Sequence, residues 1–266
     1  MTGPQRMTLA ERLLLLVSRD PRQGAYPPLV QEGGESDPLA LLRRVFPGRL
    51  DDLAGRRVLD FGCGGGAQVV ALARAGAARV VGLEIKPEHV AEARRRADAA
   101  GVDGRVEIRS ALGPADAGRF DLVLSQNAME HFDDPRAVLA DMTRALAPGG
   151  SILVTFGPPW YAPYGGHMHF FTRLPWATVL FGERTVMRVR ARFRDDGATR
   201  YAELQEGLNR MSLAKFERLV AESGLAVIER RDDQVRGQRW LGRMPLLREL
   251  STTQVSCVLA RRAAGT

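Results

Sequence analysis

The segment that most constrains the fold is an apolar run that passes directly into glycines, Val58-Leu59-Asp60-Phe61-Gly62-Cys63-Gly64-Gly65-Gly66-Ala67. Glycines let the backbone turn sharply and let a ligand lie against it, so the pattern predicts a strand, a tight turn and a helix around a binding site. The spacing Gly62-x-Gly64-x-x-Ala67 also fits the dinucleotide fingerprint. By itself, therefore, the turn does not choose the ligand.

Around this turn, short apolar runs alternate regularly with helical stretches. The pattern predicts strands over 57–61, 79–84, 105–109, 120–125 and 151–156, with helices over 67–75, 87–100 and 135–146. A later helix over 212–223 and apolar runs over 225–229 and 254–259 bring the strands to seven. Such alternation is typical of a mostly parallel sheet with helices on both faces. We predict an α/β fold of the Rossmann-like kind.

Composition limits the class of protein. The chain has 266 residues, 45% of them hydrophobic and 26% charged, as expected for one ordered globular domain with added elements. The net charge of +7 raises nucleic acid or an anionic membrane as partners. We discount both, because nearly all the positive charge is arginine and no basic run is interleaved with aromatic residues. We therefore expect no nucleic acid and no membrane partner.

Location and redox state follow from two further features. The longest apolar run, residues 13–17, is far shorter than a membrane span and is not followed by a cleavage-site pattern. Cys63 and Cys257 lie far apart and form neither a disulfide framework nor a metal-binding pattern. We expect a reducing, cytoplasmic environment.

Two acidic side chains at strand ends separate the possible ligands. A dinucleotide would place its pyrophosphate at the glycine turn, where the carboxylate of Asp60 would repel it. S-adenosylmethionine places a cationic amino-acid portion there, which the same carboxylate attracts. Glu84 ends the next strand, where an acid can accept hydrogen bonds from both ribose hydroxyls of an adenosyl ligand. We predict S-adenosylmethionine as the cofactor.

Three further stretches occur in an order that resembles class I methyltransferases: residues 120–125 (FDLVLS), 130–135 (EHFDDP) and 146–153 (LAPGGSIL). The pattern is most similar to the small-molecule "methyltransferase type 11" group. The resemblance covers residues 53–156 and returns faintly over 212–259. It implies a methyltransferase domain over 51–266, preceded by a helical cap over 1–50 and interrupted after the fifth strand by an acceptor-site lid over about 157–211.

The resemblance also assigns the cofactor site. Asp60, Gly62 and Gly64 would hold the methionine portion, and Cys63 lies in the same turn as a small space-filling side chain. One departure concerns the adenine, because the acid that the family often has after its third strand is replaced by a serine and an alanine. The remaining predicted contacts are Glu84 to the ribose, Ile85, Ser110 and Ala111 around the adenine, and Ser125 and Gln126 near the sulfonium.

The acceptor site is expected above the ends of the fourth and fifth strands, where residues 157–171 form a loop rich in aromatic residues and histidine. Its predicted lining is Glu130, Trp160, Tyr161, Tyr164 and Trp176. Methyl transfer requires positioning, exclusion of water and removal of a proton. Histidine suits the last task near neutral pH, so the candidate catalytic residues are His167, which we prefer, His169 and His131.

Alternatives remain for these side chains. The loop histidines could simply bond loop carbonyls, and His131 could order its own loop. His167, His169 and Glu130 could bind a divalent ion, but a carboxylate-rich pattern is missing, so we expect no metal. The stretch 184–200, in which arginines recur at alternate positions over 188–194, predicts an exposed edge strand or arm, or else a contact for an anionic group of the acceptor or its carrier.

The sequence therefore predicts an S-adenosylmethionine-dependent methyltransferase acting on a small molecule, with an oxygen or nitrogen nucleophile favoured and specialised metabolism as a fitting context. One alternative is carbon methylation of a polyketide-like or isoprenoid-like acceptor. Another is a non-catalytic module that binds the cofactor for structure, which the intact Asp60, glycine turn and Glu84 argue against. A homodimer is left open.

Overall fold

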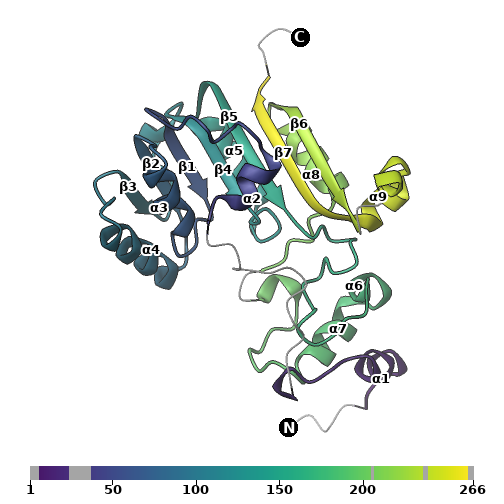
Figure 1. Ribbon diagram of the computed structural model, residues 1–266. Helices are drawn as coiled ribbons and strands as arrows, with labels where there is room; N and C mark the ends of the chain where they lie inside the picture. The colour runs from purple at the N-terminus through teal and green to yellow at the C-terminus, as the bar shows by residue number, and fades with distance from the viewer. Residues whose placement is uncertain (1–5, 24–36, 205–206, 236–238, 263–266) are drawn as a thin grey trace.

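A computed structural model describes residues 6–23, 37–204, 207–235 and 239–262. They form one seven-stranded sheet with helices on both faces (Figure 1). The strands are β1 (Arg57–Phe61), β2 (Arg79–Leu83), β3 (Val106–Arg109), β4 (Phe120–Gln126), β5 (Leu146–Phe156), β6 (Leu225–Gln234) and β7 (Thr252–Arg261). Their order is β3-β2-β1-β4-β5-β7-β6, and among these strands β7 runs in the direction opposite to the other six. The predicted Rossmann-like fold is confirmed.

Helices follow the strands as expected from the alternating pattern. Their bounds are α1 (Leu9–Leu16), α2 (Ala40–Val45), α3 (Ala67–Arg74), α4 (Pro87–Ala99), α5 (Pro135–Ala145), α6 (Ala177–Leu180), α7 (Glu183–Arg190), α8 (Leu213–Glu222) and α9 (Pro245–Ser251). Local signals set several of their starts. Asp134 accepts hydrogen bonds from the N–H groups of Arg136 and Ala137 at the start of α5, and Ser212 accepts one from Lys215 at the start of α8.

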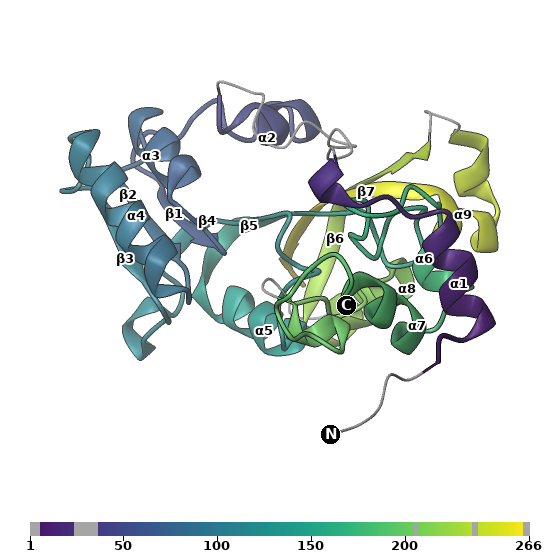
Figure 2. The ribbon, with the colours of Figure 1, turned by 90° about the horizontal axis from the view of Figure 1, so that it is seen from below.

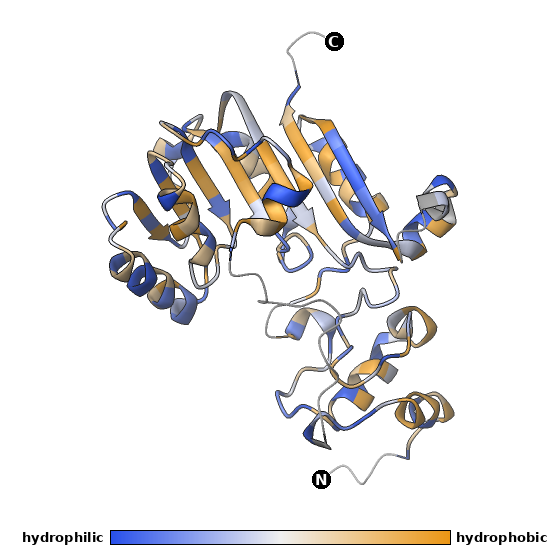
Figure 3. Cartoon of the chain, in the orientation of Figure 1, coloured by the Kyte–Doolittle hydropathy of each residue, from blue (hydrophilic) through white to orange (hydrophobic). Residues whose placement is uncertain are grey.

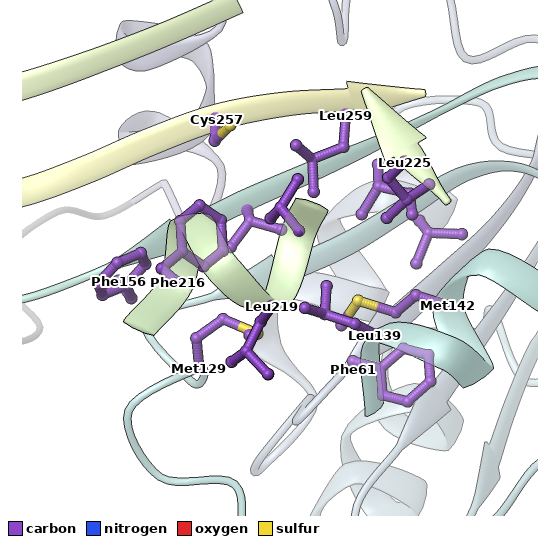
Figure 4. Close-up of a cluster of buried hydrophobic side chains, with 14 of the residues drawn as sticks. Phe61, Met129, Leu139, Met142, Phe156, Phe216, Leu219, Leu225, Cys257 and Leu259 are labelled. Carbon is purple, nitrogen blue, oxygen red and sulfur yellow. The ribbon is translucent and has the colours of Figure 1, made fainter. Parts of the chain in front are cut away.

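The two faces of the sheet are buried by different helices. Successive side chains of a strand point to opposite faces of the sheet, so alternate residues of β1 pack on different faces. Leu59 packs in the cluster that also holds Leu139 of α5 and Phe216 of α8. Figure 4 shows Leu139 and Phe216 in this cluster. Val58 packs on the other face in the cluster that includes Leu72 of α3 and residues of α2 and α4.

The edge strand β6 is protected by charge. Figure 3 shows the central strands coloured as hydrophobic and β6 with a hydrophilic stretch. That stretch holds residues 229–233 (ERRDD), and Arg230 forms ion pairs with Glu217 and Asp232. Charged side chains on an edge strand discourage further strand pairing.

The insertion, residues 157–211, lies beyond the carboxyl ends of the parallel strands, toward which the arrowheads of β1, β4 and β5 point in Figure 1. It has its own apolar cluster, which includes Trp160, Phe171 and Val186. Leu14 of α1 is buried in that cluster, and α1 lies against α7 (Figure 2). The two N-terminal helices thus pack in different places, α1 on the insertion and α2 on the sheet. The division into a cap and a main domain stays a prediction.

The prediction of an edge strand or arm over 184–200 is wrong for its first part, which is the helix α7. Its arginines alternate in sequence, but Val186, Met187 and Val189 are buried at helical spacing. Arg188 pairs with Glu11, and the buried Arg190 forms two hydrogen bonds to Asp196. The arginines therefore connect parts of the insertion and α1.

At the fifth strand the boundary also differs. The helix predicted over 135–146 ends at Ala145 in the structure, and β5 begins directly after it, at Leu146. A shift in the pairing register between Phe120 and Leu122 accommodates residues 148–150 (PGG) within the strand.

In the described ranges no helix is long and apolar enough to cross a membrane.

Candidate functional site

The turn after β1 is shaped by close packing. Gly66 has φ +80°, and a Cβ there would lie 2.7 Å from Cβ of Ala93 on α4. Cys63 fills the space beside Gly82, where a Cβ would approach its Sγ to 2.7 Å. Burial raises the pKa of the Cys63 thiol well above its usual range, with the carboxylates of Asp60 and Glu84 adding to the shift. These contacts fit the space-filling role expected of Cys63.

Asp60 lies at the end of β1 beneath this turn and is 2% exposed. Its Oδ1 accepts a hydrogen bond from Nε2 of Gln68 at 3.2 Å, while Oδ2 has no hydrogen-bond partner among the described residues. Burial raises the pKa of Asp60 to about 7. Burial of a carboxylate that accepts only one weak hydrogen bond costs free energy, unless a positively charged group binds to it. The site is therefore suited to a cation.

Glu84 follows β2 and holds the glycine turn from the other side. Its Oε2 accepts from the N–H of Gly64 at 3.1 Å, and its Oε1 accepts from the N–H groups of Ile85 and Lys86 at 2.8 and 2.9 Å. The same oxygen Oε2 lies 3.8 Å from Nδ1 of His89. Ionised carboxylate oxygens can each accept more than one hydrogen bond, so the carboxylate can still receive hydroxyl donors. Ile85 is 76% exposed and is accessible to a flat ring.

The other predicted cofactor residues lie on neighbouring strand ends. Ser125 and Gln126 end β4, and the Ser125 hydroxyl and Gln126 Oε1 are buried without a hydrogen-bond partner in the described ranges. Ser110 and Ala111 follow β3 and are both exposed. The nearby acid, Asp116, is occupied, because it accepts from the Gly113 N–H at 2.7 Å and from Arg109 at 2.9 Å.

Two of the candidate catalytic histidines lie together. The rings of His131 and His167 are 5.3 Å apart in an edge-to-face arrangement. Nε2 of His167 is buried and has no hydrogen-bond partner in the described part of the chain. Burial, together with the neighbouring His131 and His169, lowers the pKa of His167 to about 3. His167 is therefore neutral at physiological pH and is a weak proton acceptor as held here.

The glycines before His167 pack tightly. A Cβ on Gly165 would lie 2.1 Å from the carbonyl oxygen of Pro159, and one on Gly166 would lie 2.0 Å from Cγ2 of Thr178. His167 itself has φ +54°, which is unusual for a residue with a side chain. Gly165 thus allows the close approach of another backbone segment, and Gly166 leaves room for the side chain of Thr178.

The aromatic side chains predicted to line the acceptor site are distributed between the surface and the interior. Trp160 packs edge to face on Tyr201 with ring centroids 4.9 Å apart, inside the apolar cluster of the insertion. Trp176 donates from Nε1 to the carbonyl of Leu250 at 3.2 Å. Tyr161 is exposed, and Tyr164 is half-buried. Their contact with an acceptor stays a prediction.

Glu130 is buried in the segment between β4 and α5, and its Oε1 accepts from the Gly157 N–H at 3.0 Å. This bond ties the segment to the first residue of the insertion. The predicted absence of a metal is not tested by this structure. Within the described ranges, no group of three or more His, Cys, Asp or Glu side chains is placed to hold a metal ion.

The sequence patterns did not single out residues 207–211, which end the insertion. Nδ1 of His131 lies 2.9 Å from the carbonyl oxygen of Gly207, and the amide of Asn209 bonds two carbonyls of the His131 loop. The N–H of Trp160 donates to the carbonyl of Met211 at 2.7 Å. These contacts join parts of the chain far apart in sequence, so no local motif indicated them.

Residues 59–154 match the family model of the methyltransferase domain. This part of the chain is similar to methyltransferase domains. The ubiquinone biosynthesis O-methyltransferase of Xanthomonas oryzae pv. oryzae (strain PXO99A) is 38% identical over 122 residues, which cover 43% of this chain and 51% of that protein. The chain thus spans about half the length of the curated relatives it matches.

Solved structures share the fold of the methyltransferase domain. An S-adenosylmethionine dependent methyltransferase from Mesorhizobium loti superposes with a TM-score of 0.54 at 20% identity, over 83% of this chain and 96% of that one. The geranyl diphosphate C-methyltransferase of Streptomyces coelicolor A3(2), solved with Mg²⁺, geranyl diphosphate and S-adenosyl-L-homocysteine, gives 0.53 at 19% identity over 80% and 75%. At such identities the likeness concerns the fold alone.

Proposed function

We propose that this protein is an S-adenosylmethionine-dependent methyltransferase acting on an oxygen nucleophile of a small molecule. The observation that carries the proposal is Asp60, a buried carboxylate whose Oδ2 has no partner in the described ranges, beneath a turn open at Gly64. The methionine ammonium of the cofactor is a cation of the right kind for that oxygen. A dinucleotide pyrophosphate would instead meet a negative charge.

The remaining cofactor contacts follow from the same turn. Glu84 would accept from the ribose hydroxyls, the exposed Ile85 would cover one face of the adenine, and Ser125 and Gln126 would lie toward the methyl group. When bound, S-adenosylmethionine supplies an electrophilic methyl group. The chain must then orient the acceptor, exclude water and take up a proton.

Oxygen is favoured as the methylated atom because the Xanthomonas relatives are named O-methyltransferases. The proton acceptor we propose is the pair of His131 and His167 at the insertion. His131 is the better candidate of the two for taking the proton, since burial lowers the pKa of His167 to about 3. His169, two residues along the same loop, remains a weaker candidate.

Two measurements test the proposal. Calorimetry should detect binding of S-adenosylmethionine and S-adenosylhomocysteine but not of NAD. A panel of phenols, catechols and amines, incubated with S-adenosylmethionine carrying a labelled methyl group, should yield a labelled product from a hydroxyl-bearing compound. Binding of NAD without a response to either adenosyl ligand would refute the cofactor assignment, and labelling of amines alone would refute the preference for oxygen.

A further inference from the structure

Asn209 connects the end of the insertion to the loop between β4 and α5. Its side-chain nitrogen donates to the carbonyls of Met129 at 2.7 Å and Phe132 at 2.8 Å. Its backbone N–H donates to the carbonyl of Glu130 at 3.0 Å. A single residue therefore holds three carbonyls within four consecutive residues, and His131 lies among them.

The ring of His131 is oriented by the same segment. Its Nδ1 lies 2.9 Å from the carbonyl oxygen of Gly207, two residues before Asn209. Because a carbonyl oxygen only accepts hydrogen bonds, Nδ1 must carry the hydrogen. In a neutral imidazole the nitrogen that can take up a proton is then Nε2. The position of one backbone carbonyl thus decides which nitrogen of His131 is basic.

Asn209 is itself held in place from two sides. Its carbonyl accepts a hydrogen bond from Nζ of Lys215 at 2.6 Å, and Met211 bonds the N–H of Trp160 in the insertion. Lys215 belongs to α8, which packs against the sheet. The segment 207–211 is therefore anchored to the sheet by α8 and to the insertion by Trp160.

We propose that Asn209 is the positioning residue for His131. By holding residues 129–132 against the segment 207–211, it keeps the Gly207 carbonyl on Nδ1 and so maintains the Nδ1–H tautomer. Asn209 acts through His131, and the proposal assigns it no contact with cofactor or acceptor. The expected effect of Asn209 on turnover rests on the proposed methyltransferase function, whereas its expected effect on the His131 tautomer does not.

Long-range ¹H–¹⁵N spectra of protein labelled at the imidazole nitrogens report the tautomer directly. The chain has 4 histidines, so the signal lost in His131→Gln identifies His131. We expect the Nδ1–H form in the wild type and a mixture of both tautomers in Asn209→Ala. Asn209→Asp should show the same mixture, since a carboxylate of almost the same shape cannot donate to the two carbonyls. Persistence of the wild-type tautomer in either folded variant would overturn the proposal.

The matched control is Leu14→Ala. Leu14 is fully buried in the cluster of the insertion, which also holds Leu208, so its truncation weakens the packing of that cluster but removes none of the hydrogen bonds of Asn209. Its unfolding temperature should fall while the His131 tautomer stays as in the wild type. Loss of the tautomer in this control as well would mean that general loosening is responsible, and Asn209 would have no special role.

Turnover gives a second readout. With an acceptor from the panel above, Asn209→Ala and Asn209→Asp should lose about 10²-fold in kcat, the scale expected when a catalytic group is displaced by about 1 Å. Their Kd for S-adenosylhomocysteine should stay unchanged, because Asp60 and Glu84 are not disturbed. If the wild type transfers no methyl group to any acceptor, the proposed function fails, and the spectra still decide the role of Asn209.

Discussion

Nε2 of Gln68 donates a hydrogen bond of 3.2 Å to Oδ1 of Asp60, across the glycine turn from α3 to the end of β1. A hydrogen bond from a neutral amide stabilises a buried carboxylate much less than a cation would. Burial therefore raises the pKa of Asp60 to about 7. The ionised carboxylate is therefore unfavourable in this place unless a cation lies beside it. Binding and stability should respond to Asp60 in opposite directions.

Replacement of Asp60 by asparagine is the first test. Asp60→Asn keeps the shape and removes the charge, so the ligand-free protein should gain about 1–3 kcal/mol in the free energy of unfolding. Its Kd for S-adenosylmethionine should rise about 10- to 100-fold, the loss expected for a charge-assisted hydrogen bond of about 1.5–3 kcal/mol. Denaturant unfolding and calorimetry measure the two quantities. Unchanged affinity would remove Asp60 from the ligand site.

The pH dependence of stability should show Asp60 and His167 opposing each other. Asp60 has its pKa raised from 3.8 to about 7, so the folded state binds more protons than the unfolded state in that window and stability falls as pH rises. His167 has its pKa lowered from 6.5 to about 3, so the unfolded state binds more protons there and stability rises with pH.

Between about pH 4 and 6.5 these two contributions offset each other in the wild type. Substitution of either Asp60 or His167 should reveal the pH dependence of stability that the other residue causes. Unfolding temperatures of Asp60→Asn should rise more steeply with pH than those of the wild type, and those of His167→Phe should fall with pH. Parallel pH profiles for all three proteins would show that neither group is perturbed as the structure indicates.

Glu84 holds the glycine turn and is proposed to bind the ribose, and two substitutions separate these two roles. Its carboxylate accepts three backbone N–H groups, from Gly64, Ile85 and Lys86, so Glu84→Ala should cost about 1–3 kcal/mol of stability as well as cofactor affinity. Glu84→Gln keeps one accepting oxygen and should cost less stability, while still losing about 10-fold or more in Kd for S-adenosylhomocysteine. Thermal unfolding and calorimetry on both variants measure the split. Equal affinities for wild type and Glu84→Gln would argue against a ribose contact.

Close packing at Gly166 should be intolerant of a methyl group. A Cβ there would lie 2.0 Å from Cγ2 of Thr178, so Gly166→Ala should destabilise the protein by about 1–3 kcal/mol. Gly104→Ala is the control, because a Cβ at Gly104 meets nothing within 4 Å. Adding Thr178→Ala to Gly166→Ala should restore part of the loss. Chemical denaturation measures the stability of these variants. Equal stabilities for Gly166→Ala and Gly104→Ala would mean that the insertion relaxes to accommodate the added methyl group.

Local periodicity predicted the sheet and its helices closely, since β1 spans Arg57–Phe61 as expected and β7 and β6 complete the sheet. The position of Asp60, Glu84 and Ser125 at one edge of the sheet could also be predicted, because strand ends in a parallel sheet meet at one edge, and their contact with the cofactor stays a prediction. Periodicity failed at α7, where arginines at alternate positions masked a helix whose buried face includes Val186 and Arg190. An arginine paired with Asp196 can occupy a buried position that a hydrophobic pattern does not reveal.

The acceptor side was less predictable, because its contacts join distant segments. His131 and His167 are 36 positions apart and meet ring to ring, and Asn209 is in neither of their motifs. His167, the preferred base, lies in a glycine-containing loop. Its burial, which the sequence could not indicate, is what weakens it as a proton acceptor.

The two histidines should therefore differ in turnover. His131→Gln should lose about 10²–10⁴-fold in kcat, the usual contribution of a positioned general base. His167→Gln removes a neutral ring that touches His131 edge to face, and its larger effect should fall on KM for the acceptor.

The pH dependence of turnover separates the roles of His131 and His167 further. A general base gives a rate that rises with pH until the base is deprotonated and then levels, and this rising limb should persist in His167→Gln and vanish in His131→Gln. His169→Gln serves as the control from the same loop. If instead the limb survives in His131→Gln and vanishes in His167→Gln, bound acceptor must raise the pKa of His167 far above about 3, and His167 is the base.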